Sequence, residues 1–305
     1  MIYIISAVLL MCVSVFIIIP YICYRKAFYT SGKSHGMDIS NDKDYLDWRG
    51  QMLTWKSEVY ALPCRRVEIK SRDGLVLSGR YFEYSPDAPI EILFHGYKGR
   101  SDDLCAGVIR CRAVGHSTLL VDQRASGESE GHTVSFGVLE KDDCLLWVDY
   151  VVKNINPHAK IILSGVSMGA STVMLASCQP LAQNVVGVLA DCGYSSGEKI
   201  IKKIIAQMKL PPKAVYPLLR LGGKMFAGFD IKEADCTRAV AQSRVPIIFY
   251  HGDSDGFVPC EMSRENYKAC VSRKKLIIIK GAGHGLCFPV NPEEYISALK
   301  EFFGE

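Results

Sequence analysis

The sequence has 305 residues, of which 49% are hydrophobic, and a formal net charge of +4 from 36 basic and 32 acidic side chains. This length allows one large domain or two small ones, and the motif spacing described below favours one. The mixed charges exclude a basic tract for nucleic acid, and the hydrophobic content excludes a disordered chain.

The first element is an uncharged stretch from Ile2 to Tyr24. About 23 helical residues would extend on the order of 34 Å, so we predict a transmembrane helix within residues 1–26. A cleaved signal peptide is the alternative, but no basic region precedes the stretch and no small-residue cleavage site follows it. Arg25, Lys26 and Lys33 follow the uncharged stretch, which predicts a single-pass protein of the cell membrane with a cytoplasmic catalytic domain.

The 12 cysteines agree with that side of the membrane, because so many unpatterned thiols are easiest to keep reduced in the cytosol. They form no C-x-x-C pair and have no neighbouring histidine at ligand spacing, so we predict no metal site from them. Residues 27–61 are polar and aromatic and are expected to form a juxtamembrane linker, with a short helix near 44–58.

The remaining residues, 62–305, are predicted to form one α/β domain. Alternating apolar residues at 66–70 and 75–81 predict an antiparallel hairpin. Continuous apolar runs then alternate with helical spacing, which is typical of buried parallel strands covered by helices on both faces. The expected strands are 90–94, 118–121, 161–163, 185–189, 245–250 and 276–279, and the expected helices are 104–113, 137–152, 168–177, 264–271 and 292–303.

The interval 195–243 interrupts this alternation with two amphipathic pieces around Pro211-Pro212. We predict a small helical lid there. The alternative is an ordinary crossover helix followed by a long loop.

The most specific motif is Gly165-Val166-Ser167-Met168-Gly169, which lies directly after a predicted strand and before a helix of small residues. Glycines two positions either side of the serine permit a tight turn that exposes its hydroxyl. The N-terminus of the following helix adds partial positive charge where an oxyanion would form. This pattern predicts Ser167 as a nucleophile.

Two further expected strands, 245–250 and 276–279, follow the interval 195–243. Asp255 lies in the loop after the first of them and His284 in the loop after the second. Loops at the carboxyl ends of parallel strands meet at one edge of a sheet, so the three side chains can converge. We therefore predict His284 as the general base and Asp255 as the acid that orients it. Asp253 is the rival acid, but it is expected to cap its own turn.

A glycine-rich segment, Phe94-His95-Gly96-Tyr97-Lys98-Gly99, ends the first predicted parallel strand. Its backbone can approach a substrate closely. The backbone N–H groups of Tyr97 and Met168 are the predicted oxyanion-hole donors. His95 is expected to support the loop rather than to titrate.

These motifs, together with Asp122-Gln123-Arg124-Ala125-Ser126-Gly127 and Asp191-Cys192-Gly193-Tyr194-Ser195-Ser196, resemble the α/β-hydrolase superfamily from about Val67 onward. More narrowly they are similar to membrane-anchored hydrolases related to the serine aminopeptidase and monoacylglycerol-lipase group. Ser126 departs from the histidine common in relatives, which leaves the triad untouched but alters the adjoining loop. The resemblance implies a covalent acyl-enzyme and no cofactor.

Three functions follow from these patterns. The first is a serine hydrolase of small or lipid-derived carboxylic esters, and the second is an aminopeptidase-like enzyme. The third is a binding module without catalysis, which the three predicted triad residues disfavour. An apolar pocket roofed by residues 195–243 would favour esters, whereas a carboxylate cluster near Ser167 would favour a peptide amino terminus.

Overall fold

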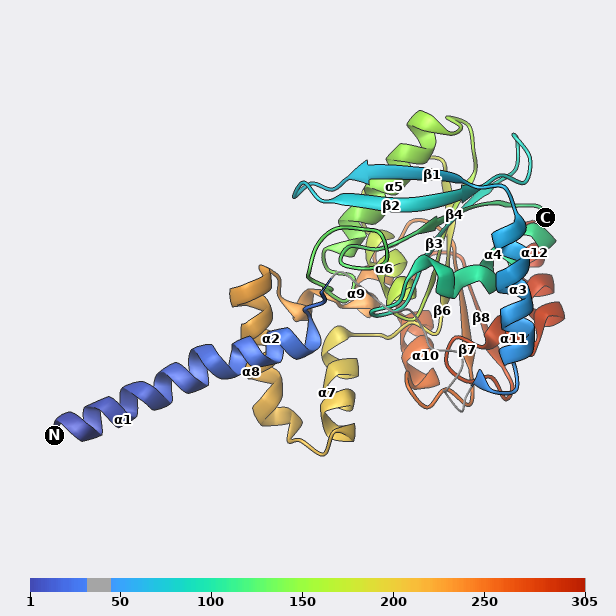
Figure 1. The fold of residues 1–305 in the computed structure, drawn as a ribbon. Helices are drawn as coiled ribbons and strands as arrows, with labels where there is room; N and C mark the ends of the chain where they lie inside the picture. Colours follow the sequence, from blue (N-terminus) through green and yellow to red (C-terminus); the bar gives the residue numbers. More distant parts are fainter. Residues whose placement is uncertain (32–44, 305) are drawn as a thin grey trace.

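A computed structural model describes residues 1–31 and 45–304 of the chain. Eight strands form one sheet in the order β1-β2-β4-β3-β5-β6-β7-β8, in which β2 runs antiparallel to both β1 and β4 and the other neighbours are parallel. The predicted hairpin and the predominantly parallel sheet are therefore confirmed (Figure 1). The strands are β1 Arg65–Lys70, β2 Val76–Phe82, β3 Ile90–Phe94, β4 Ser117–Val121, β5 Ile161–Val166, β6 Val185–Asp191, β7 Ile247–Gly252 and β8 Lys274–Ile279.

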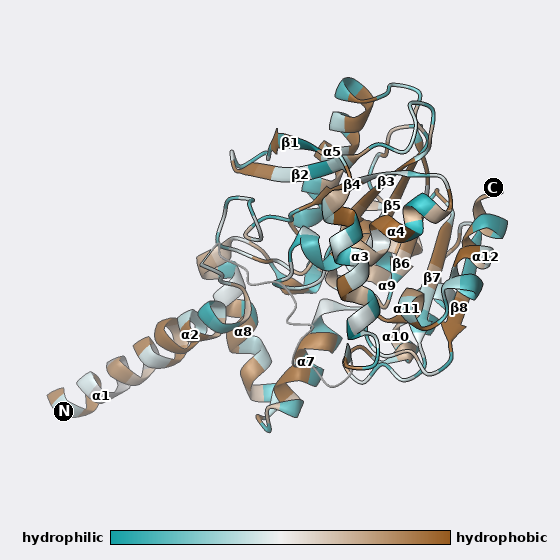
Figure 2. Cartoon of the chain, turned by 45° about the vertical axis from the view of Figure 1, so that its right-hand side comes forward, coloured by the Kyte–Doolittle hydropathy of each residue, from teal (hydrophilic) through white to brown (hydrophobic). Residues whose placement is uncertain are grey.

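Helices cover both faces of the sheet. Successive residues of a strand point to opposite sides, so a strand of apolar residues has side chains to bury on both faces. In β5, Ile161 and Leu163 belong to one core cluster and Ile162 to another, and all three are fully buried. The apolar colour of the central strands in Figure 2 reflects this two-sided burial. The helices of the domain are α3 Arg49–Ala61, α4 Cys105–Ala113, α5 Glu140–Asn154, α6 Met168–Ala176, α7 Gly197–Gln207, α8 Pro212–Ala227, α9 Cys236–Val240, α10 Cys260–Ala269, α11 Cys287–Val290 and α12 Pro292–Phe303, with 3-10 turns η3 Ser101–Leu104 and η4 Ile231–Glu233.

The predicted transmembrane helix within 1–26 requires correction. The stretch is divided into α1 Ile2–Val13, a π-helical turn η1 Ser14–Ile18 and α2 Ile19–Ala27. Among the described residues no helix combines the length and the apolarity needed to cross a membrane. The cytoplasmic orientation inferred from the flanking charges stays a prediction.

The end of that stretch is packed on protein, whereas α1 projects from the rest of the chain (Figure 1). Helix α2 lies against α8, and a Cβ atom at Gly222 would come within 2.2 Å of the Pro20 carbonyl oxygen. Just after α2, Phe28 is fully buried, with its ring centroid 4.9 Å from that of Phe229. Part of the predicted anchor therefore belongs to the globular core.

The interval 195–243 is helical, as predicted, and contains α7, α8 and α9. Helix α7 buries Ile200, Ile201 and Ile205 in the core, and α8 packs against α2. None of the residues in 195–243 lines the cavity described below. The apolar face of the interval packs on the core and on α2, and the lid stays a prediction.

The predicted linker, 27–61, lies in part outside the described residues, at 32–44. Its described C-terminal part is the helix α3, close to the position expected. This helix packs against α4, and Met52 and Val59 are buried. Residues 45–61 thus form part of the domain surface around the site.

Candidate active site

Ser167 occupies a strained turn between β5 and α6. Its backbone angles are φ 58° and ψ −117°, a conformation that non-glycine residues rarely adopt. A Cβ atom at Gly169 would lie 1.9 Å from the Phe94 carbonyl oxygen, and one at Gly165 would lie 2.2 Å from the backbone of Gly169. Both motif glycines are therefore needed, because the backbone segments around the turn are in direct contact and leave no room for a Cβ atom at either position.

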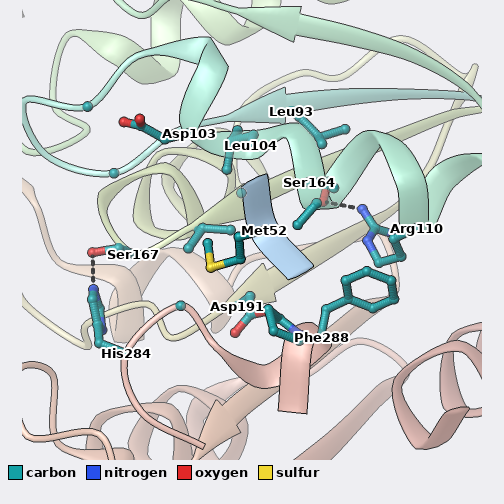
Figure 3. Close-up of a pocket in the computed structure, with 18 of the residues that line it drawn as sticks. Met52, Leu93, Asp103, Leu104, Arg110, Ser164, Ser167, Asp191, His284 and Phe288 are labelled. Carbon is teal, nitrogen blue, oxygen red and sulfur yellow. Dashed lines mark hydrogen bonds between the residues drawn. The ribbon is translucent and has the colours of Figure 1, made fainter. Parts of the chain in front are cut away.

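The loops after β7 and β8 bring Asp255 and His284 to Ser167. The Ser167 hydroxyl oxygen lies 2.9 Å from His284 Nε2, and His284 Nδ1 lies 2.7 Å from Asp255 Oδ2 (Figure 3 draws the first of these contacts). Both distances are within hydrogen-bond range. The three residues predicted as a triad therefore form one continuous hydrogen-bonded chain, in the order that general-base activation of a serine requires.

The Asp255 carboxylate is stabilised in its charged form. Burial by itself would raise the pKa of Asp255, but hydrogen bonds with His251 and His284 outweigh burial and hold that pKa well below its usual value. Its Oδ1 also accepts the backbone N–H groups of Phe257 and Val258 at 2.9 and 2.8 Å. An ionised acid can therefore orient His284 Nδ1–H.

His251 was not among the predicted site residues. Its Nε2 lies 3.2 Å from Asp255 Oδ2 and its Nδ1 lies 2.7 Å from the Ser263 hydroxyl. The sequence feature that could have indicated His251 is its position at the end of a buried strand, four residues before Asp255. By contrast, Asp253 Oδ1 accepts the Ser254 hydroxyl at 3.0 Å within its own loop and the Gly281 N–H at 2.7 Å from the loop after β8.

The two predicted oxyanion donors flank Ser167. Met168 is the first residue of α6, so its N–H has no partner within the helix. The loop after β3 approaches from the other side, since a Cβ atom at Gly96 would lie 3.5 Å from Ser167 Cβ. The next N–H in that loop belongs to Tyr97. This placement is compatible with an oxyanion hole made of Tyr97 and Met168.

His95 supports the same loop from a fully buried position. Burial lowers the pKa of His95, which favours its neutral form. Its Nδ1 donates to the Gly96 carbonyl at 2.8 Å, while its Nε2 accepts the Gln123 N–H at 3.0 Å. Because one ring nitrogen donates and the other accepts, the neutral tautomer satisfies both contacts, and His95 has the supporting position that was expected.

A cavity of about 260 Å³ opens beside Ser167 and His284. Met52 of α3, Leu104 and Phe288 contribute apolar walls. Tyr45 also lines it, and its hydroxyl donates a 2.7 Å hydrogen bond to the His284 carbonyl. Sequence reasoning missed Tyr45 and Met52, because no motif marks a residue whose role comes from contact with a segment far along the chain.

Solved structures of several known proteins are similar in fold to this chain. No family profile matches the sequence. An esterase of Pyrococcus furiosus, Pf2001, superimposes with a TM-score of 0.65 and 22% identity over 81% of this chain and 94% of that chain. Est1E of Butyrivibrio proteoclasticus, solved with ferulic acid, gives a TM-score of 0.58 and 22% identity over 77% of this chain and 97% of that one. The chain has the α/β-hydrolase fold.

A third α/β-hydrolase-fold structure, acetyl xylan esterase 1 from Thermoanaerobacterium sp. JW/SL YS485, gives a TM-score of 0.57 and 14% identity over 85% of this chain and 93% of that one. The curated protein YqkD of Bacillus subtilis (strain 168), which is uncharacterised, is 26% identical over 190 residues, or 62% of each protein. The match therefore spans less than two thirds of that relative. The narrower resemblance to membrane-anchored hydrolases stays a prediction.

Cys192 brings a thiol close to Asp255 and His284. Its sulfur, an Asp255 oxygen and a His284 nitrogen lie within 4.8 Å of one another. Burial raises the pKa of the Cys192 thiol well above its ordinary value, which disfavours the thiolate that metal binding requires. Asp255 and His284 are already paired with each other, so we infer no metal centre from this cluster.

Proposed function

We propose that the protein is a serine hydrolase that cleaves carboxylic esters through a covalent acyl-enzyme. The observation that carries this proposal is the hydrogen-bonded chain from Ser167 through His284 to Asp255, which lies at a largely apolar cavity. The esterases that share the fold support the ester substrate class. Because one of them binds ferulic acid, small esters are the first substrates to try.

In the proposed reaction, His284 Nε2 takes the proton of Ser167 as its oxygen attacks the ester carbonyl carbon. The N–H groups of Tyr97 and Met168 stabilise the resulting oxyanion. Protonated His284 then gives the proton to the departing alcohol as the C–O bond breaks. Water, deprotonated by His284, attacks the acyl-enzyme, and the carboxylic acid leaves as Ser167 regains its proton.

The test is turnover of p-nitrophenyl esters of graded acyl length beside aminoacyl-anilides, for the full chain and for Ser167→Ala. We expect ester turnover that Ser167→Ala lowers by several orders of magnitude. Ser177→Ala is a matched control, since Ser177 is also buried near the end of α6 but donates to the Met174 carbonyl instead. It should retain activity.

Each outcome assigns the function differently. Ester turnover that depends on Ser167 supports the proposal and begins to define the acyl length. Turnover of anilides alone would transfer the assignment to an aminopeptidase. Equal activity in Ser167→Ala and the parent chain, or none in either, would contradict catalysis by Ser167.

A further inference from the structure

The inner end of the cavity is polar, in contrast to its walls. Arg110, Ser164, Asp191 and Tyr295 line this end. Figure 3 shows Ser167 and His284 on one side of the cavity and Arg110 and Ser164 on the other, with Asp191 between them. A substrate group that enters beside Ser167 would therefore pass apolar side chains before it reaches hydrogen-bonding groups.

Arg110 is already matched in charge. Its guanidinium makes two hydrogen bonds to the carboxylate of buried Glu91, at 2.7 and 3.1 Å, and a third contact of 3.3 Å to the Ser164 hydroxyl oxygen. The Glu91 carboxylate also contacts His116 at 2.7 Å. This group of side chains therefore needs no anion from a substrate.

Among the described residues, only one of the two Asp191 carboxylate oxygens has a hydrogen-bond donor of normal geometry. The Asp191 side chain lies at the end of β6 and the residue is 4% exposed. Its Oδ2 accepts the Tyr295 hydroxyl at 3.1 Å. Its Oδ1 has no hydrogen bond of normal geometry from any group in the described part of the chain, although the Cys287 thiol interacts with the same carboxylate. A buried acceptor without a donor is costly, and a donor on a ligand would relieve that cost.

We propose that Asp191 Oδ1 accepts a hydrogen bond from a hydroxyl group at the far end of the substrate's acyl group. This inference rests on the proposed ester hydrolysis and specifies its substrate class as hydroxylated acyl esters. The donor is a neutral hydroxyl rather than an ammonium group, because the Arg110 guanidinium lines the same end and an ammonium would lose its hydration along the apolar walls.

The group in the cavity is the acyl part rather than the alcohol. The acyl group stays covalently attached to Ser167 between the two half-reactions, whereas the alcohol must depart before water attacks. A cavity that extends inward from Ser167 toward Arg110 can therefore hold the acyl group while it is attached to Ser167. A hydroxyl that replaces the missing donor to Asp191 would then contribute to acyl selectivity.

The test compares methyl 3-(4-hydroxyphenyl)propanoate with methyl 3-phenylpropanoate, which differ only in the terminal hydroxyl. We expect kcat/KM to favour the hydroxylated ester by about ten- to a hundredfold. Asp191→Leu removes the acceptor and should bring the ratio close to one. Tyr295→Phe is the matched control, because it removes the partner of the other Asp191 oxygen and should keep the preference.

Two results would overturn the inference while the proposed function stands. One is equal, Ser167-dependent turnover of the two esters by the parent chain, a comparison that needs no variant to fold. The other is a hydroxyl preference that persists in folded Asp191→Leu. If Ser167 supports turnover of neither these esters nor the p-nitrophenyl series, the proposed function fails separately. Calorimetric binding of 4-ethylphenol against ethylbenzene then decides, and equal affinities would exclude the role of Asp191.

Discussion

The Tyr97 hydroxyl donates a 2.7 Å hydrogen bond to the backbone carbonyl of Ala27. This bond joins the loop that carries a proposed oxyanion donor to the last turn of α2. In the same loop, Lys98 Nζ lies 3.3 Å from the Lys26 carbonyl. The carbonyl end of α2, with its unsatisfied acceptors and partial negative charge, thus holds the loop after β3 through two side-chain donors.

Tyr97→Phe should therefore lower kcat for a p-nitrophenyl ester by about tenfold, since a loop displacement of a fraction of an ångström weakens oxyanion stabilisation. The KM should change less. Tyr250→Phe is the control, because it removes a buried 2.9 Å hydrogen bond, to the Tyr295 carbonyl, away from this loop. Steady-state kinetics of both variants decide the point, and equal losses in kcat would show that Tyr97 has no positioning role.

Truncations should separate α1 from α2. Removal of residues 1–13 takes away side chains that are exposed where described, such as Met1 at 93% and Ile2 at 75%. We expect that truncation to leave the thermal midpoint unchanged. Removal of residues 1–31 also takes away buried Tyr24 and Phe28, and loss of one buried phenylalanine side chain alone costs about 3–5 kcal/mol. Thermal unfolding of the two truncated proteins checks this, and equal midpoints would contradict it.

Asp255→Asn should reduce kcat by about 10⁴-fold, because an amide cannot stabilise the imidazolium and favours the wrong tautomer of the histidine. Asp253→Asn should retain kcat within a few-fold, since Asp253 bonds to the Gly281 N–H and the Ser254 hydroxyl rather than to His284. Kinetics of the pair on one ester distinguish the acid from its rival. A larger loss in Asp253→Asn would reverse the assignment.

Glu91→Gln should destabilise the protein by about 3–5 kcal/mol near neutral pH, because it leaves Arg110 buried without a counter-charge. Burial would raise the pKa of Glu91, but Arg110 and His116 outweigh burial and lower it to about 2. A depressed carboxyl pKa contributes stability above the unfolded value of about 4.3, and this contribution is lost as pH falls towards the folded pKa.

Urea unfolding of the parent chain and Glu91→Gln between pH 7 and pH 2 measures this effect. The difference between the two proteins should narrow as the pH falls below about 4. Glu128→Gln removes an exposed ion pair with Arg66 of 3.0 Å and should change stability by less than about 1 kcal/mol. A pH-independent difference for Glu91→Gln would contradict the charge argument.

Local sequence patterns were sufficient for the sheet and for the proximity of Ser167, Asp255 and His284, since each residue follows a parallel strand with an apolar sequence. They were insufficient for Tyr45, which contacts His284 across 239 residues of sequence. The structure does not support the predicted transmembrane helix, for a related reason. An uninterrupted apolar stretch is equally typical of a spanning helix and of a helix whose end packs on protein, and the close approach of Pro20 to Gly222 has no local signature.

The hydrogen bond between Tyr45 and the His284 carbonyl also bears on the order of folding. Contacts between residues so far apart in sequence require the closure of a long loop, and such contacts slow folding. The histidine proposed as general base is therefore fixed in place only when the two ends of the domain have met. Recovery of ester hydrolysis during refolding should then lag behind recovery of helical signal, so enzymatic activity would report the completed fold.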